Sequence, residues 1–232
     1  MPGAKTLRVG VVGLGMGKNH AWAAVQVPQT TLTAIAEPQE ERYHQFIETS
    51  AKQGETKVAE GASRAERFDD YQSMVESGAV DAVCIALPTD MHYDATQFCL
   101  RKGMHVMCEK PPTTRAVEML RIARNAYERG LAYAYVRQQR FDPKKMTCRD
   151  LAQKGKLGRV YHAESHWMRS RGIPFRGGWG VNKNAGGGVL LDLGVHKVDD
   201  AWFCMGNPAP AVAFGGMHCG FDYLAKGQKL SM

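Results

Sequence analysis

The sequence lacks the patterns that mark several large classes of protein. None of its apolar runs approaches the ~20 residues that a membrane-spanning helix needs. Its N-terminal stretch, MPGAKTLRVG, contains no apolar signal region before the first expected strand. Six cysteines are present, but no two of them form a CxxC pair and most stand among apolar residues. We therefore expect a soluble, reduced, cytoplasmic protein with no membrane partner and no structural metal.

Positive charge is in excess, but it is not concentrated. Lys and Arg number 30 against 23 Asp and Glu, which gives a formal charge of +7 over 232 residues. No basic run carries the interleaved aromatic residues that a nucleic-acid groove needs. We expect no nucleic-acid partner, and the excess charge favours an anionic small ligand such as a dinucleotide.

Strand-like and helix-like segments alternate through the first 137 residues. We expect strands over 7–12, 32–36, 56–59, 79–87, 105–108 and 132–136. We expect helices over 18–27, 39–52, 71–76, 91–102 and 114–129. Such alternation with short loops is typical of an α/β fold, a doubly wound parallel sheet. Residues 1–137 are therefore predicted to form one domain.

The pattern changes beyond residue 137. Helices are expected over 142–154 and 189–204, strands over 160–167 and 211–218, and a loop dense in Gly, Arg and Trp over 169–188. These elements predict a second, smaller α+β domain over residues 138–232 with an open sheet.

A glycine-rich loop lies between the first strand and the first helix. It consists of Gly13, Leu14, Gly15, Met16 and Gly17. Glycines let the backbone approach a pyrophosphate, and the following helix N-terminus favours its negative charge. The spacing, GxGxG, is one residue tighter than the usual GxGxxG. In this context the loop predicts dinucleotide binding.

An acidic residue, Glu37, ends the second strand 24 positions after Gly13. A carboxylate there is expected to bind the adenosine ribose hydroxyls and to repel a 2′-phosphate. This favours NAD over NADP as the cofactor. Arg42, on the next helix, leaves NADP open.

A lysine follows the strand at 105–108 and precedes two prolines, Pro111 and Pro112. Proline holds the residue before it out of the helical region, so Lys110 is fixed at the carboxyl end of a strand. Ligands bind at that edge of open parallel sheets. Lys110 is a candidate acid, base or electrostatic clamp, and the alternative is a solvated loop lysine.

Asp192 and His196 are four residues apart on one expected helix, and Asp199 continues the same face. A carboxylate that reaches an imidazole can orient it and raise its basicity. Spacing alone favours the other interpretation, a structural helix with a satisfied interior histidine.

Two further groups of polar side chains have simpler interpretations. His162, Glu164 and His166 alternate along an expected strand, but side chains two apart stand ~7 Å from each other. A polar sheet face is favoured over a metal site. Cys108 lies two residues from Lys110, which could lower the pKa of its thiol, although a place in the strand core is the favoured interpretation.

Together these motifs resemble the Gfo/Idh/MocA oxidoreductases, the family of glucose–fructose oxidoreductase and inositol dehydrogenase. The matching segments are VGVVGLGMGKNHA, IALPTDMH, the EKP of Glu109-Lys110-Pro111, and GGGVLLDLGVHKVD. The resemblance implies an N-terminal Rossmann domain and a second domain whose open sheet often forms the interface of a homo-oligomer.

The resemblance also implies roles for single residues. Lys110 would contact the nicotinamide or the substrate, and Glu109 belongs to the same cofactor-binding motif. Asp192 and His196 would hold the substrate hydroxyl, with His196 the general base. The last positions that the resemblance implies are the loop along the cofactor at Pro88, Thr89 and His92. Independently of the resemblance, Arg169, Arg171 and Trp179 are substrate candidates because they stand in the loop dense in Gly, Arg and Trp.

We therefore expect an NAD(P)-dependent oxidoreductase that acts on a hydroxyl or carbonyl of a sugar, polyol or inositol-like substrate. Family members usually continue well past the length of this chain, so an incomplete second domain is expected. The alternatives are a non-catalytic dinucleotide-binding regulator, an inactive truncated member of the family, and a glycosidase that uses NAD transiently.

Overall fold

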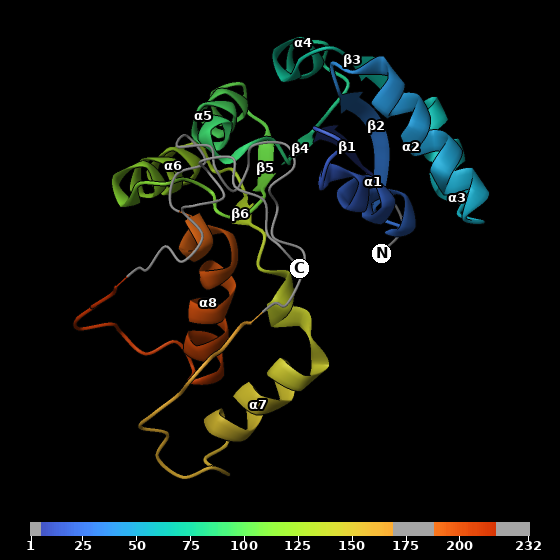
Figure 1. The fold of residues 1–232 in the computed structure, drawn as a ribbon. Coiled ribbons are helices and arrows are strands. Elements are labelled where there is room, and N and C mark those ends of the chain that lie inside the picture. The colour runs from blue at the N-terminus through green and yellow to red at the C-terminus, as the bar shows by residue number, and fades with distance from the viewer. Residues whose placement is uncertain (1–5, 169–187, 217–232) are drawn as a thin grey trace, which may run out of the picture. The chain divides into compact units, whose positions relative to one another are not determined.

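Six parallel strands form the centre of the first part of the chain in the computed structural model, which describes residues 6–168 and 188–216. The chain divides into two units, residues 1–136 and 137–232. In the first unit the strands are ordered β3-β2-β1-β4-β5-β6 (Figure 1). They are β1 (Leu7–Val12), β2 (Thr30–Ala36), β3 (Glu66–Phe68), β4 (Ala82–Ile85), β5 (His105–Cys108) and β6 (Tyr133–Tyr135).

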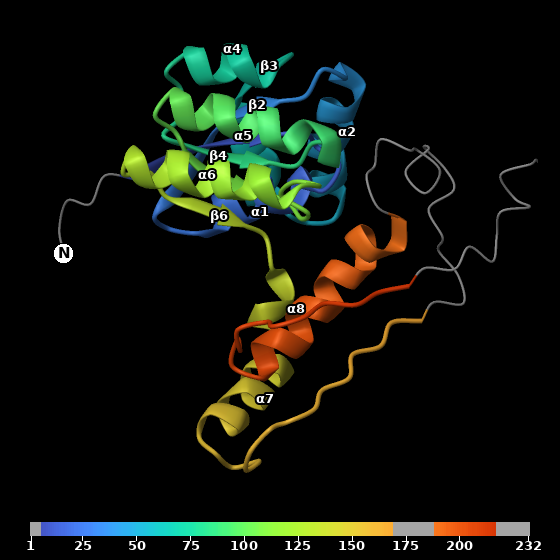
Figure 2. The same cartoon turned by 90° about the vertical axis from the view of Figure 1, so that its left-hand side faces the viewer.

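Helices cover both faces of this sheet (Figures 1 and 2). They are α1 (Gly17–Gln26), α2 (Glu40–Lys52), α3 (Thr56–Arg64), α4 (Tyr71–Glu76), α5 (His92–Arg101) and α6 (Ala116–Glu128), with a 3-10 turn η1 (Thr89–Met91) before α5. The predicted α/β class is thus confirmed. The strand order reverses direction between β1 and β4, the position where doubly wound sheets bind ligands.

The sheet buries apolar side chains on each face because successive residues of a strand point in opposite directions. In β1, Val9 and Val11 join the cluster under α1, α2 and α3. Val83 and Ile85 of β4 join the opposite cluster, together with side chains from α4, α5 and α6. The unit therefore has a complete two-sided core.

The third strand was predicted in the wrong place. Residues 56–59 lie in α3. The strand at this place in the sheet is β3, which has three residues, and only Phe68 among them is apolar. Val58, Ala59 and Ala62 are buried along one side of α3, which is helical spacing. An edge strand needs little apolar sequence, so β3 had no strong pattern to find.

The described part of the second unit is helical. It contains a 3-10 turn η2 (Gln138–Phe141), α7 (Pro143–Gln153), a π-helical turn η4 (Leu190–Gly194) and α8 (Val195–Cys204). Asp142 caps α7 by accepting a hydrogen bond from the Lys144 N–H at 2.8 Å. The strand expected over 160–167 is not formed, and neither is one over 211–216. The apolar side chains there are exposed, as Tyr161 and Phe214 show, so no strand of the described residues covers them.

None of the helices in the described ranges is both long enough and apolar enough to span a membrane.

Candidate functional site: the carboxyl edge of the sheet

Four of the predicted binding segments lie at one edge of the first unit. The Gly-rich loop follows β1, Glu37 follows β2, Pro88 lies three residues after β4, and Glu109 directly follows β5. Because these strands are parallel neighbours, their carboxyl ends meet at the same edge. The sheet thus brings together segments that are up to about a hundred residues apart in the sequence.

The glycines of the loop have three different roles. Gly13 has a φ of +81°, and a Cβ there would lie 2.8 Å from the Ala86 carbonyl oxygen. A Cβ on Gly17 would lie 2.9 Å from Val11 Cγ1, so this glycine lets α1 approach the sheet. At Gly15 a Cβ would meet nothing within 4 Å. The space beside Gly15 can therefore admit a ligand against the backbone.

The start of α1 fits an anion. No side chain caps the N-terminus of this helix, and its first turn has no acidic residue. Free backbone N–H groups at a helix N-terminus bind phosphate oxygens well. The loop and this helix end would hold the pyrophosphate of a dinucleotide.

Glu37 is buried, at 2% exposure, and is bonded to the loop itself. Its Oε2 accepts from the Leu14 N–H at 2.9 Å, and its Oε1 accepts from the Gln39 N–H at 3.1 Å. Arg42 approaches Oε2 at 3.7 Å. A carboxylate has further lone pairs, so Glu37 retains acceptor capacity for ribose hydroxyls.

The segment after β4 is held by His92 from α5. Pro88 is exposed, whereas Thr89 and His92 are buried. Nδ1 of His92 lies 2.7 Å from the Pro111 carbonyl oxygen, and Nε2 lies 2.8 Å from that of Leu87. At 1% exposure, with a carbonyl oxygen within hydrogen-bond distance of each ring nitrogen, His92 lies buried between the two loops.

Glu109 and Lys110 follow β5 directly. Glu109 is 8% exposed; its Oε1 lies 2.8 Å from His20 Nε2, and its Oε2 accepts from the Lys110 N–H at 3.1 Å. Burial acts to raise the pKa of Glu109, but the His20 and Lys110 hydrogen bonds outweigh it and the pKa is lowered. Lys110 is half-buried, and its peptide bond to Pro111 is cis.

The Cys108 thiol does not become more acidic near Lys110. Cys108 is fully buried, and burial raises the pKa of the thiol to about 12. The core interpretation holds, and this cysteine is no nucleophile.

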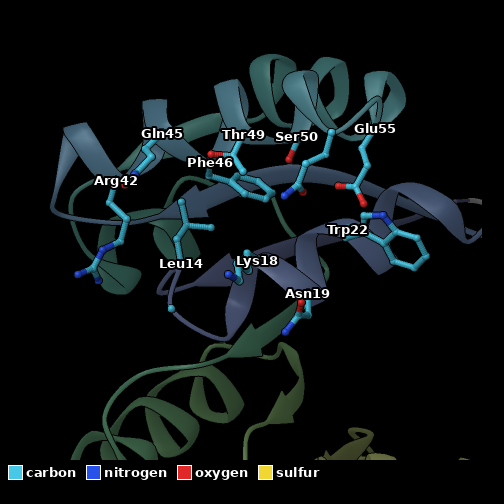
Figure 3. A pocket seen from close by; sticks show the side chains of 12 residues that line it. Leu14, Lys18, Asn19, Trp22, Arg42, Gln45, Phe46, Thr49, Ser50 and Glu55 are labelled. Carbon is cyan, nitrogen blue, oxygen red and sulfur yellow. The ribbon is translucent and has the colours of Figure 1, made fainter. Parts of the chain in front are cut away.

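A pocket of about 830 Å³ opens beside the Gly-rich loop (Figure 3). Leu14 and Gly15 line one part of it, Lys18 and Trp22 line it from α1, and Arg42 and Phe46 line it from α2. The two cationic side chains stand near the loop that would hold a pyrophosphate. The pocket is thus suited to anionic groups at that end.

The Asp192–His196 pair lies in the second unit. Asp192 is in the η4 turn and His196 is one turn later in α8, buried at 8% exposure. The His196 ring lies 6.0 Å from that of Trp167, centroid to centroid. The Lys197 ammonium lies 5.2 Å from the same Trp167 ring.

Asp199 was expected to continue the helix face of Asp192 and His196, but it binds arginines outside this helix. Both its oxygens accept from Arg140 at 2.7 and 2.6 Å, and Arg137 approaches at 3.5 Å. The next residue, Asp200, is buried and pairs with Lys145 and Lys197, each at 2.6 Å. These two aspartates hold α8 to its neighbours.

The group of His162, Glu164 and His166 does not form a metal site in the described part of the chain. Among the described residues, no three His, Cys, Asp or Glu side chains are grouped to hold a metal ion. His162 and His166 each contact the exposed Glu164, at 3.2 and 3.1 Å. The substrate candidates Arg169, Arg171 and Trp179 lie outside the described residues.

Sequence reasoning missed His20. It stands within the segment VGLGMGKNHA but was given no role of its own. A histidine one turn after the glycines of this loop was a usable signal. Its partner, Glu109, is 89 residues away, so only the fold shows the contact.

Two family models match this chain. One, described as an oxidoreductase family with an NAD-binding Rossmann fold, matches residues 7–136. The other, the Gfo/Idh/MocA C-terminal domain, matches residues 146–220.

Individual proteins are also similar. A D-glucoside 3-dehydrogenase of Escherichia coli is 31% identical over 206 residues, which is 88% of this chain and 55% of that protein. An NADP⁺-dependent scyllo-inositol 2-dehydrogenase of Bacillus subtilis is 28% identical, over 64% of this chain and 41% of its own. A solved NAD-binding protein from Listeria innocua has a TM-score of 0.70 at 28% identity, with 84% of this chain and 54% of that one covered. The chain therefore spans about half the length of the relatives that it matches.

Proposed function

Because the chain belongs to the Gfo/Idh/MocA family of NAD(P)-binding oxidoreductases, we propose that it transfers a hydride between NAD and a hydroxyl-bearing carbon of a sugar, polyol or inositol. The observation that carries the proposal is the convergence at one sheet edge. There the Gly-rich loop, Glu37 and the Glu109-Lys110 segment lie at the ends of adjacent parallel strands. The names of the dehydrogenases among the relatives support the substrate class.

The cofactor side of the reaction is assigned to the first unit. NAD, when bound, supplies the hydride acceptor. The open space at Gly15 and the uncapped start of α1 would bind its pyrophosphate, and Glu37 its adenosine ribose. His92 would contribute by holding the loops after β4 and β5 rather than by direct contact.

Proton transfer is assigned to Lys110 and to the Asp192–His196 pair. Oxidation of an alcohol removes a proton from its oxygen as hydride leaves its carbon, so a base and a nearby cation are needed. His196 would accept the proton, and Asp192 would orient its ring. The Lys110 ammonium would stabilise negative charge as it develops on the substrate oxygen.

The test is NADH formation, followed by absorbance, against a panel of sugars, polyols and inositols. Lys110→Ala is expected to lower kcat by a factor on the order of 10² or more, because a charge that stabilises the transition state is lost. The matched control is Lys52→Ala, since Lys52 is an exposed helix lysine paired with Glu48 at 3.5 Å. Turnover that survives Lys110→Ala unchanged would contradict the assignment.

The same assay separates the other candidate functions. A regulator would bind NAD without turning over any substrate of the panel. A glycosidase that uses NAD transiently would release a hydrolysed sugar with no net NADH, which product chromatography would detect.

A further inference from the structure

Lys110 lies between two residues that are each bound by a histidine. On one side, the Glu109 carboxylate contacts His20 of α1 at 2.8 Å. On the other, the carbonyl oxygen of Pro111 lies 2.7 Å from His92 Nδ1. Both rings are largely buried, so neither contact is weakened by free exchange with water.

The two contacts restrain the backbone on either side of Lys110 in different ways. His92 binds the backbone at Pro111 and also Leu87, so that side is fixed directly to the loop after β4. On the other side, the Lys110 N–H donates to Glu109 Oε2 at 3.1 Å. One oxygen of the Glu109 carboxylate therefore contacts the backbone of Lys110, and the other lies beside His20.

We infer that His20 is a positioning residue that fixes Lys110 through the Glu109 carboxylate. His20 belongs to α1, the helix whose N-terminus would bind the pyrophosphate. The contact thus joins the cofactor-binding helix to the residue assigned to proton transfer. The inference rests on the proposed function for its catalytic consequence, but the contact itself can be measured independently.

The titratable groups around this carboxylate define the expected pH behaviour. They are His20 on α1, Lys110 on its own segment, and the Cys108 thiol at the end of β5. Burial acts to raise the pKa of Glu109, and the His20 hydrogen bond is the largest influence that lowers it. Without His20 the pKa of Glu109 should rise, and the carboxylate should take up a proton at higher pH.

The first measurement is amide hydrogen exchange at Lys110 by NMR on the full chain. In His20→Leu the Glu109 carboxylate loses a partner, and the Lys110 N–H should exchange faster than in the wild type. His20→Gln places an amide N–H close to the position of Nε2 and should restore slow exchange. His20→Asn, one methylene shorter, should not restore it, and it provides the same comparison if the leucine variant fails to fold.

The second measurement is the pH profile of turnover. His20→Leu should lower kcat by on the order of 10²-fold, as misplacement of a reacting group does, with little change in KM. The acid limb of its pH profile should move to higher pH, which a purely structural loss would not cause. His20→Gln should keep both the rate and the acid limb near those of the wild type.

The matched control is His44→Leu. His44 also contacts a glutamate, Glu40, at 3.5 Å, but both side chains are exposed on α2. If Lys110 exchange and the acid limb respond alike in His20→Leu and His44→Leu, the inference is overturned. If the wild type turns over no substrate while His20→Leu still accelerates Lys110 exchange, the proposed function fails and the positioning role stands.

Discussion

At the scale of the residue, Glu37 is engaged by the protein before any ligand binds. Two backbone N–H groups donate to its carboxylate, and the Arg42 guanidinium lies 3.7 Å away. The carboxylate therefore shapes the Gly-rich loop as well as the proposed ribose site. Its negative charge opposes a 2′-phosphate, while Arg42 partly offsets that charge.

We expect Glu37→Gln to shift the preference between cofactors toward NADP. The amide oxygen keeps an acceptor for the Leu14 N–H, the amide NH2 cannot accept from the Gln39 N–H, and the charge is removed. Loss of ~1.4 kcal/mol of repulsion, modest for two charges near a surface, would change the ratio of the two dissociation constants about tenfold. Titration of both dinucleotides by thermal shift measures the ratio. Glu40→Gln, at an exposed position of α2, is the control, and an unchanged ratio in Glu37→Gln would refute the role.

The lowered pKa of Glu109 makes the stability of the folded protein depend on pH. Because the pKa is lowered in the folded state, the ionised carboxylate stabilises the fold above the ordinary glutamate range. That contribution is lost as the pH falls through the folded-state pKa.

At the scale of the element, α8 is held by charge as well as by apolar contact. Arg140 of η2 binds both oxygens of Asp199, and its guanidinium lies 4.8 Å from the centre of the Phe203 ring. Arg149 of α7 stacks on the same ring at 4.5 Å. Since Asp192 and His196 lie at the start of this helical segment, these contacts help to set their place within the second unit.

We expect Arg140→Leu to destabilise the second unit by about 3 kcal/mol, because Asp199 would keep a largely buried charge with its bidentate partner removed. In denaturant titrations followed by fluorescence, Trp167 and Trp202 report on this unit and Trp22 on the first. Arg124→Leu breaks an exposed pair with Glu128 and should leave the denaturation midpoint nearly unchanged. Equal losses in the two variants would show that the Asp199 contact contributes little.

At the scale of the whole molecule, the residues assigned to the cofactor and Lys110 belong to the first unit, whereas the proposed pair Asp192–His196 belongs to the second. Every residue of the two hydrophobic clusters, and every strand of the sheet, lies within 1–136. The first unit thus contains all the apolar packing that its sheet needs. The chain as a whole carries a formal charge of +7, which favours encounter with an anionic dinucleotide.

A fragment of residues 1–136 should therefore fold and bind NAD without catalysing turnover. Its dissociation constant should stay within about tenfold of the full chain's, or ~1.4 kcal/mol, because the loop and Glu37 are retained. Isothermal titration with NAD, beside the NADH assay, measures both properties. A fragment that is unfolded by circular dichroism, or that fails to bind NAD, would contradict the proposed division.

The sequence by itself determined the class of the fold and most of the sheet edge. Apolar runs bounded by glycine and proline located five of the six strands, since a buried parallel strand needs continuous apolar residues. The Gly-rich loop and Lys110 were found because local backbone chemistry, φ at glycine and at proline, is readable from residue types alone. These predictions depend only on residues that are close together in the sequence.

Only the tertiary structure decided contacts between distant segments. β3 went unrecognised because an edge strand of three residues carries little periodicity, and the strand expected over 160–167 found no partner among the described residues. The pairing of His20 with Glu109 and of Asp199 with Arg140 has no local pattern, because each joins residues more than fifty positions apart. Burial and hydrogen bonding across elements, which assign roles to these side chains, arise only when the strands and helices have packed.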